Sequence, residues 1–181
     1  CFNTASNTSS TVAGGECNTA PSPYSFVGGG YKNCAGNAYS VVGGGWCNLS
    51  NASYGFIGGG LCHTSSGYYN VIGGGKSNTT SSSYYGAIFG GRNNTATGDF
   101  SFIGQGDGNT ASGVHTGVLA GHNNCACCNC SFIVGDSITS DRCCATFVNN
   151  LSIKSIPTSS SGLPSGSVWR CTTDNTLRIV P

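Results

Sequence analysis

The side chains with the most evident chemistry are twelve cysteines in a chain of 181 residues. This density and the even count are typical of disulfide-bonded proteins outside the reducing cytosol. Four pairs lie fourteen to sixteen residues apart, and we expect each to form a disulfide: Cys1 with Cys17, Cys47 with Cys62, Cys128 with Cys143, and Cys130 with Cys144. Cys34, Cys125, Cys127 and Cys171 have no evident partner within the chain, so links between chains are open to them.

A second chemistry for the cysteines is metal binding. Cys125, Cys127, Cys128 and Cys130 form a cluster, and Cys143 and Cys144 follow it. Four thiolates can hold zinc, but zinc sites usually show two C-x2-C pairs, which this cluster lacks. Disulfides are therefore the favoured interpretation. Free buried thiols and a metal site are the alternatives, and we expect no cofactor.

Acid–base catalysis has little support in this composition. The six acidic residues are scattered, and only Asp136 and Asp141 are near each other in sequence, where both suit a turn. A glycosidase needs two carboxylates at one site, so we do not expect an enzyme, and a polysaccharide-active solenoid is a weak alternative. His63 and His115 occupy positions that asparagine and aromatic residues fill elsewhere in the chain. They are interpreted as scaffold substitutions, with an axial metal in an oligomer as the alternative.

Asparagine offers one further chemistry, N-glycosylation, which matters only if the chain passes through a glycosylating secretory route. The N-x-S/T sequons are at Asn7, Asn48, Asn51, Asn78, Asn93, Asn129 and Asn150.

These side chains are placed by a repeat. A β-branched residue recurs every fifteen residues, with one interval of sixteen, between Ile72 and Ile88. This core ladder consists of Val12, Val27, Val42, Ile57, Ile72, Ile88, Ile103, Val118, Ile133 and Val148. A fixed period indicates a repeat architecture, and the longer interval places a one-residue insertion between Thr79 and Tyr85.

Each repeat has the same internal order. An aromatic residue stands three positions before the ladder residue, as in Tyr24-Ser-Phe-Val27, and a glycine run follows, as in Gly28–Gly30. The first segment predicts a short strand and the glycines a sharp corner. Six residues after the ladder comes an asparagine that we expect to turn the chain and to stack in a hydrogen-bonded ladder: Asn18, Asn33, Asn48, Asn78, Asn94, Asn109 and Asn124.

Fifteen residues match one coil, or rung, of a parallel β-solenoid. Glycine in every unit and the absence of a 3.6-residue period exclude helix for most of the chain. About ten rungs at roughly 4.8 Å predict an all-β rod of roughly 48 Å. Cysteines one repeat apart would then lie within the Cα separation that a disulfide spans.

The strand pattern predicts self-association. Alternate strand residues face opposite sides, so the aromatic residue and the Phe or Val before the ladder share one face, and the ladder residue occupies the other. Only one face can fill so thin a coil, and the second would be a long apolar patch, unusual on a soluble monomer. We therefore expect a parallel homo-oligomer.

Composition excludes other partners. Charged residues make up 7% of the chain and the formal net charge is +1, so no nucleic-acid footprint is expected. No apolar run is long enough to insert in a membrane. The chain begins at Cys1 without a signal peptide, which suggests a processed product or a piece of a longer protein.

The ladder ends at Val148, so we expect a solenoid over residues 1–148 and a separate segment over 149–181. Ser167–Thr173 and Thr176–Val180 flank Asp174-Asn175, a plausible two-residue hairpin turn. Trp169 and Cys171 would share its small core. We expect this β-hairpin to cap the last rung, whose backbone groups would otherwise be unpaired.

The repeat, seen in Asn109-Thr-Ala-Ser-Gly113 and Ser40-Val-Val-Gly-Gly-Gly45, resembles the YadA-like head repeat of trimeric adhesins and of viral or phage tail fibres. The resemblance implies a left-handed parallel β-roll with three chains side by side. The tail from Gly162 to Val180 is similar to the ends of viral fibre proteins. Two features depart from the family, namely fifteen residues per rung where fourteen is common, and the many cysteines. The implied function is an extracellular fibre segment on a virion or cell surface that attaches to a receptor or glycan.

A different class of function is ice binding by a flat β-solenoid. Threonines occupy one repeat position: Thr4, Thr19, Thr64, Thr79, Thr95 and Thr110. Cys34, Leu49 and Cys125 interrupt this row, and we expect no accompanying T-x-T rank. Ice binding is therefore an alternative to the fibre.

Overall fold

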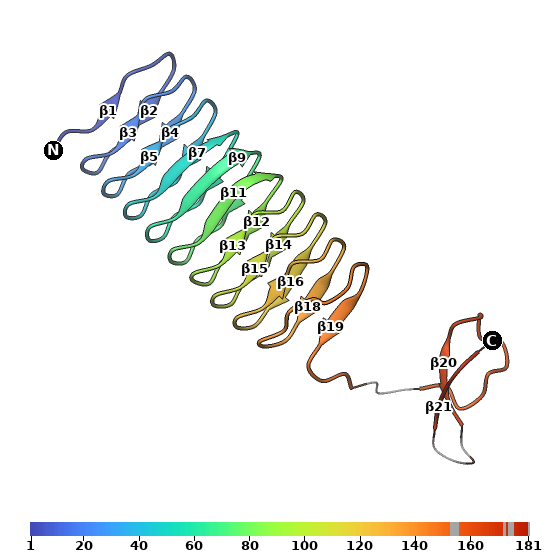
Figure 1. The fold of residues 1–181 in the computed structure, drawn as a ribbon. Helices are drawn as coiled ribbons and strands as arrows, with labels where there is room; N and C mark the ends of the chain where they lie inside the picture. Colours follow the sequence, from blue (N-terminus) through green and yellow to red (C-terminus); the bar gives the residue numbers. More distant parts are fainter. Residues whose placement is uncertain (153–155, 172, 174–175, 181) are drawn as a thin grey trace. The chain divides into compact units, whose positions relative to one another are not determined.

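A computed structural model describes residues 1–152, 156–171, 173 and 176–180 of the chain. The chain separates into two compact units, Cys1–Asn149 and Asn150–Pro181. The first unit is a parallel β-solenoid of about ten turns, drawn from blue to orange in Figure 1. No helix occurs among the described residues.

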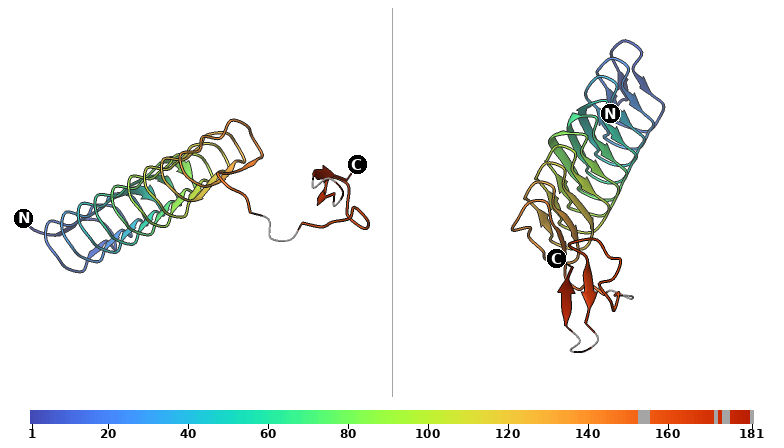
Figure 2. Two further views of the ribbon diagram at one scale, coloured as in Figure 1. Left: turned by 90° about the horizontal axis from the view of Figure 1, so that it is seen from below. Right: turned by 90° about the vertical axis from the view of Figure 1, so that its right-hand side faces the viewer.

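Two parallel sheets run along the solenoid, one on each side of the coil (Figure 2). The nine-stranded sheet contains β1 (Thr4–Ala5), β3 (Thr19–Ala20), β5 (Cys34–Ala35), β7 (Leu49–Ser53), β9 (Thr64–Tyr68), β11 (Thr79–Tyr84), β13 (Thr95–Ala96), β15 (Thr110–Ala111) and β17 (Cys125–Ala126). The ten-stranded sheet contains β2 (Thr11–Val12), β4 (Phe26–Val27), β6 (Val41–Val42), β8 (Phe56–Ile57), β10 (Val71–Ile72), β12 (Ala87–Ile88), β14 (Phe102–Ile103), β16 (Gly117–Ala120), β18 (Phe132–Val134) and β19 (Thr146–Val148).

Each strand pairs with its counterpart on the next coil, so equivalent side chains stack. Val27 pairs with Val42, and Val42 with Ile57. The register of β11 against β9 shifts between Thr80 and Ser83, within the segment where the extra residue was predicted. In-register stacking therefore turns each sequence position into a column along the rod.

The core is a thin line of side chains inside the coil, as the ladder predicts. Ladder residues from Val27 to Ile133 are fully buried, and alanines of the facing sheet, such as Ala20 and Ala111, pack against them. The end of the ladder differs from the prediction. Ile133 pairs with Phe147, which packs on the core, whereas Val148 pairs with Val134 and is exposed. The last coil is one residue shorter, which moves every later side chain by one position.

The asparagines lie inside the corner rather than at its turning residue. The left-handed backbone belongs to the residue before each of them, for example Lys32, with φ of 55°. Asn33 is buried, and its Nδ2 donates to the carbonyls of Gly29 at 2.9 Å and Gly45 at 2.7 Å. Its Oδ1 accepts the Asn48 N–H at 3.0 Å. The asparagine ladder thus satisfies buried backbone groups of adjacent glycine corners, which would be costly to leave unpaired.

The aromatic corner also departs from the expected four-residue strand. The strand is only Phe26–Val27, and Tyr24 has left-handed backbone with φ of 56°. Ser25 is buried, and its hydroxyl donates to the Ser22 carbonyl at 2.6 Å, which tightens the turn. The tight turn directs the tyrosine outward, at a corner of the coil.

The second unit contains an antiparallel pair, β20 (Val168–Arg170) and β21 (Leu177–Ile179). Cys171 is buried, and the Arg178 guanidinium lies 5.8 Å from the centroid of the half-buried Trp169 ring. The predicted turn at Asp174-Asn175 lies outside the described residues. The capping role of this unit stays a prediction. Among the described residues, none forms a helix of the length and apolarity that a membrane crossing requires.

Candidate interaction surface

The most regular surface feature is a column of stacked aromatic rings at one corner of the solenoid. We call this the aromatic column: Tyr24, Tyr39, Tyr54, Tyr69, Tyr85, Phe100 and His115. Successive ring centroids lie 4.8 to 5.1 Å apart, with interplanar angles between 3° and 23°. The tyrosines and Phe100 are 43–50% exposed. The rung spacing therefore holds a rigid stack of rings open to solvent.

A second exposed column lies two residues further along each rung. Phe26, Phe56 and Phe132 are 37–43% exposed on the outer side of the ten-stranded sheet, and Val41 and Val71 occupy the same position between them. From the sixth rung on, larger apolar residues join at the position that holds glycine earlier: Phe89, Leu119 and Val134. The Phe89 ring packs edge-on against Phe102 at 5.5 Å. The aromatic column and these residues together form what we call the aromatic face.

The aromatic face is suited to packing against another apolar surface. Its members carry no formal charge unless His115 is protonated, and stacking already limits the rotamers of the rings, which lowers the entropic cost of ordering them on association. Burying one exposed Phe or Tyr side chain fully is worth about 1.5–3 kcal/mol. A row of such side chains along seven rungs can therefore supply a large free energy of association.

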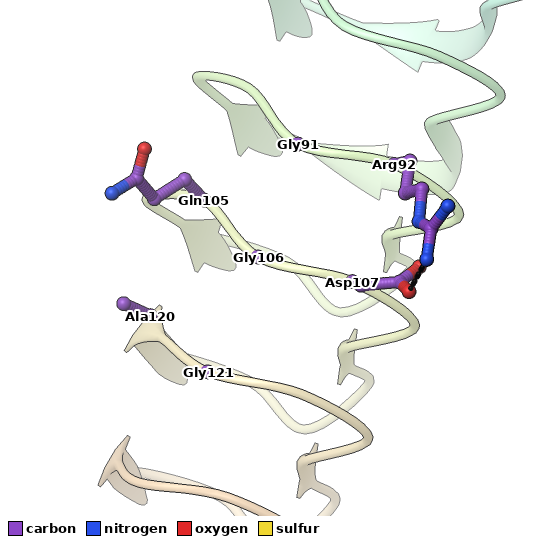
Figure 3. A pocket seen from close by; sticks show the side chains of 7 residues that line it. All are labelled: Gly91, Arg92, Gln105, Gly106, Asp107, Ala120 and Gly121. Carbon is purple, nitrogen blue, oxygen red and sulfur yellow. Dashed lines mark ion pairs between the residues drawn. The ribbon is translucent and has the colours of Figure 1, made fainter.

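A different corner carries polar and charged side chains. Isolated bridges align Glu16, Tyr31, Trp46, Leu61, Lys76, Arg92, Asp107 and His122 into one column. Arg92 Nη2 lies 2.8 Å from Asp107 Oδ2 above a shallow hollow of about 580 Å³, whose lining includes Gln105 and Ala120 (Figure 3). The hydrogen bond from Arg92, with one from Asn93, lowers the pKa of Asp107. A carboxylate held ionised is a poor general acid, and together with Arg92 it offers polar contacts beside the hollow.

The two acidic residues considered from the sequence, Asp136 and Asp141, each have a basic side chain nearby. Asp136 lies 3.7 Å from His122, and Asp141 accepts a hydrogen bond from Arg142 at 2.9 Å. The Arg142 hydrogen bond lowers the pKa of Asp141. All four groups are exposed, so these pairs contribute little stability.

Two disulfides occur in the described part of the chain. Cys1 joins Cys17, as expected, with Cα atoms 5.0 Å apart. Cys125 joins Cys127, although the sequence offered neither a partner. The remaining cysteines are free thiols: Cys34, Cys47, Cys62, Cys128, Cys130, Cys143, Cys144 and Cys171. The expected disulfides Cys47–Cys62, Cys128–Cys143 and Cys130–Cys144 are thus not formed in this structure.

Two pairs of free thiols occupy equivalent positions on adjacent rungs, Cys47 with Cys62 and Cys130 with Cys144. Cys128 instead donates to the Ser140 carbonyl at 3.3 Å, because the short last coil shifts Cys143 away from its register. Among the described residues, three potential metal ligands converge only at Cys1, Glu16 and Cys17, two of which share the disulfide.

Two of the sequons belong to the asparagine ladder. Asn48 and Asn78 are buried, and each donates its Nδ2 to two glycine carbonyls, for example Asn48 to Gly44 and Gly60. The folded solenoid therefore cannot present them for glycosylation. The other sequon asparagines are exposed: Asn7, Asn51, Asn93, Asn129 and Asn150.

His63 replaces asparagine in the ladder. The side chain is fully buried, and its Nδ1 accepts the backbone N–H of Asn78 at 3.1 Å, which requires a neutral ring. Burial lowers the pKa of His63 below its ordinary value. His115 ends the aromatic column, where it stacks on Phe100 at 4.9 Å.

Acid is expected to destabilise the solenoid through His63. Below about pH 6.5 the unfolded chain binds a proton that folded His63 resists, so stability falls by up to about 1.4 kcal/mol per pH unit until the lower folded-state pKa is reached. H63N restores the amide ladder and should remove this loss of stability in acid. Thermal unfolding at pH 8 and pH 5 measures the loss. H122N, a substitution at an exposed site, is the control. Equal acid sensitivity of H63N and the wild type would contradict this assignment.

No protein-family model matches the chain, and no curated protein matches its sequence. A parallel β-solenoid is compatible with the β-roll that the repeat resembles. What the chain does must therefore be argued from its surfaces.

Proposed function

We propose that this chain is a structural segment of an extracellular fibre, in which three parallel copies associate through the aromatic face and hold a rigid rod for attachment. The observation that supports this most directly is the exposed aromatic column from Tyr24 to Phe100. With His115, the column extends over seven consecutive rungs rather than around one pocket. A surface with that geometry fits a partner of the same length and periodicity, and a second copy of the chain is the simplest such partner.

Parallel alignment is compatible with the spacing. Copies of one solenoid share the same rung repeat, so a side-by-side pair can bring equivalent rings into contact at every rung. A globular partner could meet only a few rungs. Burial of two or three apolar side chains per rung would then supply the free energy of association.

The trimer number and the left-handed coil in this proposal rest on the resemblance to YadA-like head repeats. The two disulfides agree with the proposed extracellular location on a virion or cell surface. The charged corner around Arg92 and Asp107 lies outside the aromatic face and offers polar contacts to a receptor or glycan. We propose no catalytic role for the chain.

The native mass tests this proposal. Light scattering coupled to size exclusion is expected to give three times the chain mass of 18.2 kDa. A stable monomer at micromolar concentration would refute self-association through the aromatic face, and a dimer would refute the trimer alone.

One observation favours a second function, ice binding. On four consecutive rungs of the nine-stranded sheet, the outward threonine is followed two residues later by a second outward hydroxyl: Thr64 with Ser66, Thr79 with Ser81, Thr95 with Thr97, and Thr110 with Ser112. The sequence interpretation expected no accompanying T-x-T rank, and three of these second hydroxyls are serines. The two columns of hydroxyls, with a register shift between Thr80 and Ser83, form an array at the rung spacing that could order water.

Thermal hysteresis tests the ice-binding candidate. The purified protein should lower the freezing point of the solution below its melting point. T95Y should abolish this difference by interrupting the hydroxyl array. Freezing and melting points that coincide in the wild type would discard this candidate and leave the fibre proposal unaffected.

A further inference from the structure

Cys130 and Cys144 hold the same position on the last two rungs of the solenoid. Both have left-handed backbone, with φ of 55° and 56°. The Cys130 N–H donates to the Val114 carbonyl at 2.9 Å, and the Cys144 N–H makes the equivalent bond to Asn129 at 3.1 Å. Matching dihedrals and matching hydrogen bonds direct the two Cα–Cβ bonds in parallel, one rung apart.

The short last coil creates this alignment. With fifteen residues per rung, Cys128 would stack on Cys143 and Cys130 on residue 145. The register of β18 against β19 instead pairs Ile133 with Phe147, an offset of fourteen residues. The same offset joins Cys130 to Cys144, and Cys128 is left with Ser140 as its partner.

The two thiols are accessible and lie on adjacent rungs. Both side chains are exposed, and the register of the last coil places Cys144 at the position that corresponds to Cys130. The neighbouring Cys130 raises the pKa of Cys144, so the reactive thiolate becomes more abundant in mild alkali. An oxidant in solution therefore meets two exposed cysteines one rung apart.

We propose that Cys130 and Cys144 are an oxidative cross-linking site that closes a disulfide between the last two rungs. A low-molecular-weight disulfide such as oxidised glutathione supplies the oxidant. One thiolate attacks it, forms a mixed disulfide and releases a first reduced thiol. The second cysteine loses its proton, attacks the mixed disulfide and releases a second reduced thiol. Two protein thiols and one small disulfide thus become one protein disulfide and two small thiols.

The position of this bond explains what it does. β19 is the edge strand of the ten-stranded sheet, so the last rung has a neighbour on one side only. A solenoid unravels from its ends, because each repeat contacts only adjacent repeats. Cys1–Cys17 already ties the first rung to the second. The Cys130–Cys144 bond would secure the other end of the solenoid in the same way, independently of the proposed fibre function.

Peptide mapping tests the pairing on the intact protein. After full reduction and incubation with a glutathione redox buffer at pH 8, free thiols are alkylated and the protein is cleaved with trypsin. Cleavage after Arg142 separates the two cysteines, so the disulfide appears as a linked pair of peptides. C144S should lose this link, and the matched variant C143S should keep it.

Three outcomes would overturn the proposal: no linked pair in the wild type, a link that survives C144S, or covalent dimers on a non-reducing gel that depend on Cys130. Hydrogen exchange then tests the effect, in a C47S/C62S background that excludes the other pair of free thiols on adjacent rungs. Closing a loop of this length should slow exchange of the β19 amides roughly 100-fold. Unchanged exchange in the verified disulfide form would refute the role in securing the rung.

Discussion

Replacing Tyr39 and Tyr54 with serine is expected to convert the assembled protein to monomers. The two rings stack at 4.8 Å in the middle of the aromatic column and are 45% and 49% exposed. Full burial of an exposed side chain of this size is worth about 1.5–3 kcal/mol, so each half-exposed ring would contribute about half of that in an interface. The double variant should therefore raise the dissociation constant by a factor of roughly 10–10² per interface.

The solenoid itself should tolerate these substitutions. Serine already occupies left-handed positions in this chain, at Ser9, Ser77 and Ser137. Light scattering over a concentration series measures the assembly, and circular dichroism measures the fold. The matched control is W46S. It removes an aromatic side chain that is 57% exposed in the column that runs from Glu16 to His122, outside the aromatic face. Assembly that survives Y39S/Y54S, or that fails in W46S, would place the interface elsewhere.

Replacing Gly45 with alanine is expected to destabilise the solenoid by about 3 kcal/mol or more. Gly45 has φ of 95°, which strains any residue with a side chain. An added Cβ would also lie 2.2 Å from the Gly60 carbonyl oxygen and 2.7 Å from Asn48 Nδ2. The rung would have to move away from its neighbour, which would break the hydrogen bonds of the asparagine ladder.

The adjacent glycine is the control for this effect. A Cβ on Gly44 would meet nothing closer than 3.8 Å, and its φ lies outside the left-handed range. G44A should therefore change stability by less than about 0.5 kcal/mol. Chemical denaturation of both variants measures the difference. Similar midpoints for G44A and G45A would show that the corner does not depend on the third glycine.

The period of the chain was sufficient to predict the two-sheet solenoid and its core. Val27, Ile57 and Ile103 are buried because a coil stacked on its own copy places the same residue in the same environment. The sequence also predicted the position of the asparagine ladder, but not where the asparagine side chains point. Asparagine was expected at the turning residue because it tolerates left-handed backbone. The structure gives that conformation to Cys17 or Lys32 and points the amide of the next residue into the corner.

The aromatic stripe was predicted from alternation along a strand that is shorter than expected. Tyr24 is exposed because its backbone is left-handed, a conformation that propensity does not predict for tyrosine. The second row of hydroxyls was not predicted, because serine fills it on three of the four rungs and it therefore shows no T-x-T pattern. Serine and threonine nevertheless both present a hydroxyl at this position.

Sequence alone determined the repeat length, the core residues and the presence of a long apolar face. These properties follow from identity between successive coils, which a sequence displays directly. The tertiary structure decided which residue at each corner takes left-handed backbone, that the last coil has one residue fewer, and therefore that Cys130 aligns with Cys144. Those features depend on how a whole coil closes against its neighbour, because hydrogen bonds between rungs select one register among several that the sequence allows.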